Sequence, residues 1–191
     1  ATLCAVNGGA FTRYWLGSTV SSAGSALTTV AIPIIAVQQL GATPAQMGFL
    51  FAGATATSLV LRFPAAAWAD RSASRLSVVA AGQALSGVLI AAVPLLWAFS
   101  TIHYDSLLLV MAALAATGAV VDGFAAPTVP LLVPESALPA AYGRFTASRG
   151  AADIVGPALG GVLLQVLAAP LLLVLDAVSF FVAAASTLSV H

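Results

Sequence analysis

Asp122, Arg149 and Asp153 lie in segments that are largely apolar, where a charge is costly and usually serves a function. Asp122 stands alone in one long apolar run, whereas Arg149 and Asp153 lie near the start of another. Arg149 and Asp153 are four positions apart, so on a helix they share a face and can form a structural ion pair. Asp122 could carry a proton, or it could pair with Arg149 at a similar depth. The three residues are therefore candidates for proton coupling or for a charge network.

A second group of charges lies in the stretch from Arg62 to Arg75. The chain has six basic and six acidic residues, and four of these charged residues lie in this stretch: Arg62, Asp70, Arg71 and Arg75. Long apolar runs flank it on both sides. A short charged turn between two runs that could each cross a bilayer predicts a hairpin of two membrane helices.

Hydroxyl side chains recur at helical spacing near the start of the chain. Ser18, Ser22, Ser25 and Thr29 are separated by three or four positions, so on a helix they form one polar stripe. Two interpretations are open: the small residues allow close helix packing, or they form one wall of an aqueous cavity. Pro33 lies farther along the same segment and is expected to bend the helix.

Glycine and proline shape another apolar segment, GPALGG, from Gly156 to Gly161. Gly156 and Gly160 form a GxxxG face, which favours tight contact between membrane helices. Pro157 removes one backbone donor and introduces a bend. Gly161 adds a further small residue. Together with the neighbouring Arg and Asp, this pattern indicates a shaped helix in a bundle that moves.

Residues that commonly carry enzyme chemistry are scarce. The sequence has one cysteine, Cys4, and no lysine, and its two histidines, His103 and His191, lie far apart. These counts argue against a disulfide, a metal cluster, a Ser–His hydrolase and a nucleotide-binding Gly-x-x-x-x-Gly-Lys loop. There is also no basic run for nucleic acid. We expect no enzyme activity, cofactor, metal or nucleic-acid partner.

The composition points to a membrane protein. Of 191 residues, 61% are hydrophobic and only 6% are charged, whereas a soluble domain has about 25% charged residues. So few charges could not cover a surface that faces water. The predicted fold class is an all-α integral membrane protein in a lipid bilayer.

Apolar runs of about 20 residues predict membrane-spanning helices. The chain is expected to form one domain, 1–191, with six of them, at 14–37, 46–67, 76–98, 107–129, 147–167 and 171–190. The last two are divided at Pro170, because a single helix from Ile154 to Val190 would be ~55 Å long against a bilayer core of about 30 Å. Asp176, in the last helix, is expected to reach the outer interface or to hydrogen-bond to neighbouring helices.

The arginines indicate the orientation. All six basic residues lie before the first predicted helix, between the second and third, between the fourth and fifth, or near the same ends of those helices. The alternate connections, near 39–45, at 99–106 and around Pro170, contain none. By the positive-inside rule, the arginine-rich side is cytoplasmic. An even number of crossings then places both termini in the cytoplasm.

Four stretches carry a family resemblance: Arg13–Ala36, Pro64–Arg75, Ser148–Gly161 and Leu175–Ala184. In this order and spacing they resemble the N-terminal six-helix half of a major facilitator superfamily transporter. The resemblance is strongest to the bacterial drug-efflux branch that includes macrolide and enterobactin exporters. It implies an antiporter of the bacterial inner membrane.

The resemblance implies a mechanism and partners. A small-molecule substrate, drug-like or siderophore-like, would be exported by alternating access between two six-helix halves, driven by protons. Asp70, Arg71 and Arg75 match the family's inner-gate motif and would latch the cytoplasmic side. The other half would be a missing C-terminal half or a second copy of the chain.

The sequence also departs from the family pattern. Ala66 replaces a usual glycine and Ser74 a usual basic residue. The signature arginine in the fourth helix of many proton-coupled drug exporters has no counterpart here, since that segment offers only Asp122. The chain runs only from Ala1 to His191, so we expect a truncated chain. The alternative is a self-associating or partner-dependent six-helix membrane protein without transport of its own.

Overall fold

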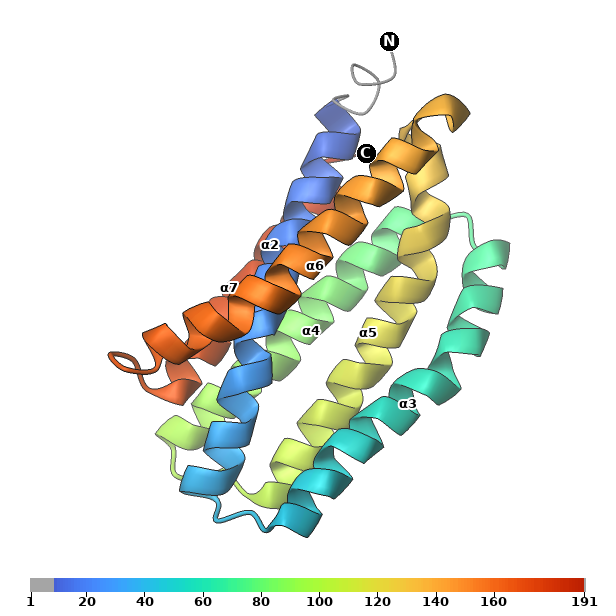
Figure 1. Ribbon diagram of the computed structural model, residues 1–191. Helices are drawn as coiled ribbons and strands as arrows, with labels where there is room; N and C mark the ends of the chain where they lie inside the picture. The colour runs from blue at the N-terminus through green and yellow to red at the C-terminus, as the bar shows by residue number, and fades with distance from the viewer. Residues whose placement is uncertain (1–8, 191) are drawn as a thin grey trace.

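The computed structural model describes residues 9–190, which form helices and no strands (Figure 1). The elements are α2 (Gly9–Ile34), the π-helix η1 (Ile35–Gln39), α3 (Pro44–Arg71), α4 (Arg75–Ala98), α5 (Tyr104–Leu132), the 3-10 helix η2 (Glu135–Ala137), α6 (Leu138–Leu163) and α7 (Ala169–Leu188). The prediction of an all-α bundle of six long helices is confirmed for this part of the chain.

Five of the six long helices are apolar and long enough to cross a membrane: α2 with η1, α3, α4, α5 and α7. α6 has the length but lies outside this group, because Arg149 and Asp153 lie in its interior and lower its hydropathy. Two of the three charged residues singled out inside apolar segments, Arg149 and Asp153, thus lie in this helix, and the third, Asp122, lies in α5.

The ends of the helices follow local signals that hydropathy does not capture. Thr43 caps α3 reciprocally with Gln46, as in a capping box. α6 begins at Leu138, well before the predicted start at 147. Pro139 is favourable in the first turn of a helix, and the polar residues that follow it continue the helix. Pro170 lies in the first turn of α7, where its missing N–H costs no hydrogen bond.

The helices are packed in an order that differs from the chain order. α2 packs against both α6 and α7, α7 packs against α4, α4 against α5, and α5 against α3. Consequently α3 and α6 are the two ends of this series, and Figure 1 shows α3 on the opposite side of the bundle from α7.

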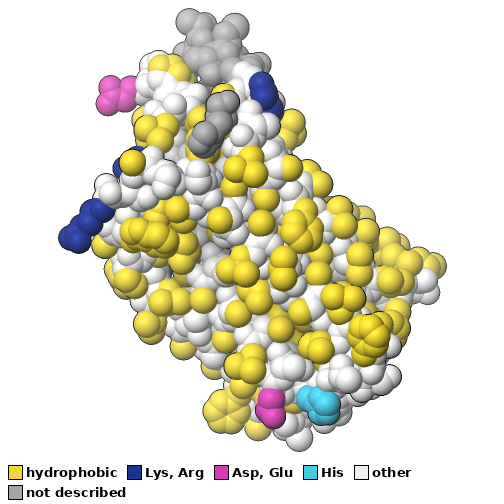
Figure 2. Space-filling view, turned by 180° about the vertical axis from the view of Figure 1, so that it is seen from behind, with side chains coloured by type: hydrophobic (Ala, Val, Ile, Leu, Met, Phe, Trp, Pro, Cys, Tyr) yellow, Lys and Arg dark blue, Asp and Glu magenta, His cyan; other side chains and the backbone are white. Residues whose placement is uncertain are grey.

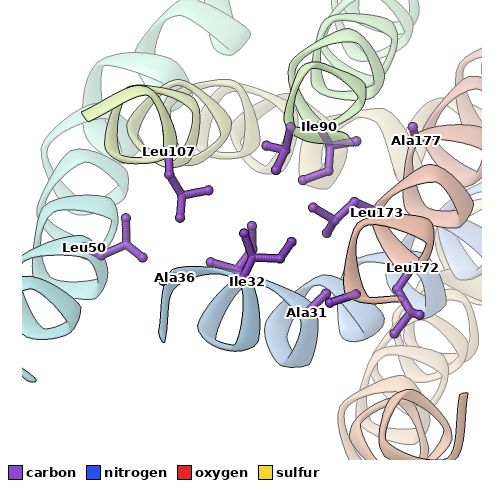
Figure 3. Packing of buried hydrophobic residues seen from close by; sticks show 12 residues of the cluster. Ala31, Ile32, Ala36, Leu50, Ile90, Leu107, Leu172, Leu173 and Ala177 are labelled. Atoms are coloured by element: carbon purple, nitrogen blue, oxygen red, sulfur yellow. The ribbon is translucent and has the colours of Figure 1, made fainter. Parts of the chain in front are cut away.

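One end of the bundle is held by an apolar cluster (Figure 3). Ile32, Leu50, Ile90, Leu107 and Leu173 come from five different helices and are almost completely buried. In a bilayer such contacts stabilise chiefly by close packing, since lipid is as apolar as leucine. This cluster lies at the end opposite Gly9 of α2 and Leu188 of α7.

The opposite end, where α2 begins, is the basic end. Phe11 and Tyr14 of α2 meet Phe145 of α6 edge to face, with ring centroids 5.8 Å and 5.7 Å apart. The Arg13 guanidinium donates to the carbonyl of Ser189 at 2.9 Å. Figure 2 shows basic side chains toward this end and a histidine at the other. The structure therefore places arginines toward one end of the bundle, as the sequence predicts.

Glycines allow α2 to approach its two neighbours closely. A side chain at Gly156 of α6 would overlap Ala26, and one at Gly17 of α2 would meet Ser186 of α7 at 2.7 Å. A side chain at Gly160 would lie 3.4 Å from Val30, which is an ordinary contact distance, whereas one at Gly161 would meet nothing within 4 Å. The GxxxG face thus packs on α2, and Gly161 is outside that contact.

We expect Gly156→Val to destabilise the bundle by about 1–3 kcal/mol, because the added methyl groups overpack the contact with Ala26. Gly161→Val is the matched control: it makes the same change on the same helix, where nothing lies within 4 Å. Thermal unfolding in detergent measures both. Equal unfolding temperatures for the two variants would contradict the assigned helix contact.

Candidate functional site

Two adjoining cavities lie along α2, α5 and α6, with volumes of about 460 Å³ and 410 Å³. They share one set of lining residues: Ser18, Ser22, Asp122, Arg149 and Asp153. Because the shared residues are hydroxyl-bearing or charged, the two cavities form one polar space inside an otherwise apolar bundle. This space is the candidate site.

The hydroxyl stripe of α2 forms one wall of that space. Ser18 and Ser22 line both cavities, and Ser25 and Thr29 line the second. The stripe also takes part in helix packing, since Ser25 reaches Asp176 on α7. The two interpretations of the stripe are therefore compatible in this structure.

An ion pair crosses from α6 to α5 at the cavity. Arg149 Nη2 lies 3.1 Å from Asp122 Oδ1, and the two side chains are 60% and 40% exposed. Asp153, one turn farther along α6, lines the same space, and so does Arg62 of α3 at the first cavity. A pair this exposed contributes only about 0–1 kcal/mol to stability. Its main consequence is that both charge signs lie in the cavity.

Aromatic residues at the basic end were not singled out in the sequence. Tyr14, Tyr142 and Phe145 line the first cavity, and the Tyr142 hydroxyl donates to the carbonyl of Ala126 at 3.0 Å. Trp15 Nε1 donates to Ser148 Oγ at 2.9 Å, which joins α2 to α6. For Tyr14 and Trp15, the sequence did contain a signal: two neighbouring aromatic residues precede the hydroxyl stripe in the same helix.

Asp176 is a second polar feature that sequence reasoning did not place among the site residues. It is only 1% exposed and lines the second cavity. Its carboxylate accepts hydrogen bonds from Thr28 and Ser179, the latter at 3.1 Å, and Ser25 Oγ lies 3.5 Å away. Of the two expectations for Asp176, hydrogen bonding to a neighbouring helix is the one observed.

The predicted inner-gate residues lie at the basic end of the bundle. Asp70 and Arg71 are exposed in the last turn of α3. Arg75, the first residue of α4, donates from Nε to the carbonyl of Ala69 and from Nη1 to the carbonyl of Pro127, each at 3.2 Å. Arg75 thus ties the α3–α4 turn to α5, while Asp70 and Arg71 present their charges outward.

The remaining predicted residues concern helix shape. Pro33 lies just before the switch from α2 to the π-helix η1, and a proline removes a helical hydrogen bond. Pro157 is on the exposed side of α6. Within residues 9–190, no group of three or more His, Cys, Asp or Glu could hold a metal ion; Cys4 and His191 lie outside this described range.

Comparison with known families gives one match. A family model described as Major Facilitator Superfamily matches residues 14–190, which is nearly the whole chain. The comparisons with curated proteins and with solved structures found no match.

We expect the cavity to be filled by water. In a variant whose Cys4 is replaced by serine, Ser22→Cys should react with a charged thiol reagent at least about tenfold faster than Val20→Cys, because only a hydrated thiol ionises to the reactive thiolate. Val20 is the matched control on the same helix: its side chain is 41% exposed but lies outside both cavities. Faster labelling of Val20→Cys than of Ser22→Cys would contradict the assignment of Ser22 to water and of Val20 to lipid.

Proposed function

The chain belongs to the major facilitator superfamily of transporters, and we propose that it exports drug-like or siderophore-like small molecules by alternating access with proton coupling. The observation that carries this proposal is the polar cavity between α2, α5 and α6. A space with both charge signs and several hydroxyls, set among largely apolar helices, suits an amphipathic solute that must leave water and re-enter it. Membership of a transporter family supports transport, rather than chemical conversion, as the activity of this site.

The Asp122–Arg149 pair supports a role in organising this site. Because Arg149 holds Asp122 in a direct charge contact at 3.1 Å, we assign the pair and Asp153 to a charge network that lies in the substrate's path. Movement of α5 against α6 would break or re-form the contact. A conformational equilibrium that changes this contact can be biased by a charged or polar substrate.

The second six-helix half is part of the proposal. Alternating access requires two bundles that rock around a central site, and here the end helices of the series, α3 and α6, carry large exposed apolar side chains. Phe63 of α3 is 81% exposed and Ile154 of α6 is 79% exposed. Either a C-terminal half or a second copy of the chain would cover part of these faces, and lipid would cover the remainder. Such faces also support the alternative, a self-associating or partner-dependent protein without transport of its own.

We further propose that the protein lies in a bacterial inner membrane with both termini in the cytoplasm. Arg13, Arg71, Arg75 and Arg144 all lie toward one end of the bundle, whereas His103 and the start of α5 lie at the other. The positive-inside rule assigns the arginine-rich end to the cytoplasm.

A reporter inserted after His103 tests the orientation. Alkaline phosphatase at this site should be active, because the enzyme matures only outside the cytoplasm. The same reporter inserted after Ala73, between α3 and α4, should be inactive. The reverse pattern would overturn the orientation.

Asp70→Asn tests the gate. In cells that express the full-length protein and are loaded with ethidium, we expect this variant to slow efflux about tenfold, because a lost latch of about 1.4 kcal/mol shifts the two-state equilibrium by that factor. Asp105→Asn is the control, since Asp105 is also exposed in the terminal turn of a helix but lies at the opposite end. If both variants pump like the wild type, Asp70 is not part of a latch. If the wild type itself does not pump, the alternative without transport is favoured.

A further inference from the structure

Asp176 of α7 lies in a setting that the charge network does not use. Its carboxylate is 1% exposed at the contact between α7 and α2, where it faces Thr28 and Ser25 of α2 and Ser179 of its own helix. Gly24 makes this approach possible, because a side chain there would come within 2.6 Å of Asp176 Oδ1. The pocket around the carboxylate is therefore built by the close packing of two helices.

The elements packed on α7 bring no cation to this carboxylate. α7 packs on α2 and α4, and neither helix carries a charged residue beyond its first turns, where Arg13 and Arg75 lie far along the chain from the contact. The charged groups that share the second cavity with Asp176 are Asp122, Arg149 and Asp153. Of these, Arg149 is paired with Asp122. A buried carboxyl group without a paired cation must be stabilised by hydrogen bonds or by a proton.

Hydroxyl neighbours suit both states of such a group. Each hydroxyl of Ser25, Thr28 and Ser179 can donate to a charged carboxylate, and each can rotate to accept from a protonated one. An arginine or lysine neighbour can only donate, so it would favour the charged state alone. The pocket can thus hold the carboxyl group with or without its proton while every polar atom keeps a partner.

The pocket also borders the cavity that we expect to hold water. Asp176 lines the second cavity, which adjoins the first through Ser18, Ser22 and the charge network. We propose that Asp176 is the proton-binding residue of the transport cycle: one proton is taken from cavity water, held as an O–H on the carboxyl group, and later returned to water. The role of this proton in transport rests on the proposed function. The binding of a proton to Asp176 does not depend on it. The proton is thus assigned to Asp176, and Asp122 is left to pair with Arg149.

Infrared spectroscopy of the full-length protein in lipid tests the proposal directly. The wild type should show the carbonyl stretch of a buried carboxylic acid, and this band should vanish reversibly as the pH rises. Asp176→Asn should lack the band, and Asp122→Asn should keep it. Absence of a titrating band in the wild type, or its survival in Asp176→Asn, would overturn the proposal.

A second pair of variants guards against misfolding of Asp176→Asn. Thr28→Ala removes one donor to the carboxylate, so the midpoint pH of the band should rise by about one unit. Thr29→Ala is the matched control, because the Thr29 hydroxyl donates to the carbonyl of Ala26 at 2.7 Å instead, and its midpoint should not move. Equal midpoints in the two variants would count against the proposal. A titrating band in a protein that moves no ethidium would support the Asp176 site and contradict the proposed transport.

Discussion

The close approach of α2 to α6 and α7 is the contact on which the other features depend. Two glycines, Gly24 and Gly156, allow this approach, because a side chain at either position would overlap the neighbouring helix. On the α7 side, this brings the hydroxyl of Thr28 to Asp176. On the α6 side, it places Arg149 beside the hydroxyl stripe, within reach of Asp122. In a bilayer, small residues are what allow backbones to approach in this way, so the packing and the polar chemistry have one cause.

As a result, α2 has two kinds of surface. Gly17 and Gly24 pack tightly against α7, whereas Ser18 and Ser22, one and two positions away from a packed residue, face the cavities. The apolar cluster around Ile32 holds the opposite end of the helix. Since α2 is fixed at that end and polar along its middle, movement at the cavity is expected to involve the less enclosed α6 and α3, not α2. This division agrees with a transporter in which one helix supports the site and its neighbours open and close it.

The sequence was sufficient for the fold class and for the number of long helices, because a span of the bilayer requires a run of apolar residues that is easy to see. It was less informative about α6: the polar residues between Leu138 and 147 hide a helix that continues beyond the apolar part. Arg149 had two possible acidic partners, and only the contact between α5 and α6 selects Asp122 over Asp153 as the observed pair. The surroundings of Asp176 could not be predicted, since Thr28 is 148 positions away in the chain. The gate residues Asp70 and Arg71 remain a prediction from family resemblance.

The central claim is that the polar cavity couples the movement of a small molecule to the opposite movement of protons. The most direct measurement uses the purified full-length protein in liposomes that contain a pH-sensitive dye, with no initial pH gradient. A gradient of ethidium across the membrane should then drive protons in the opposite direction, and the internal pH should change only while ethidium moves. Movement of ethidium without any change in internal pH would contradict the claim.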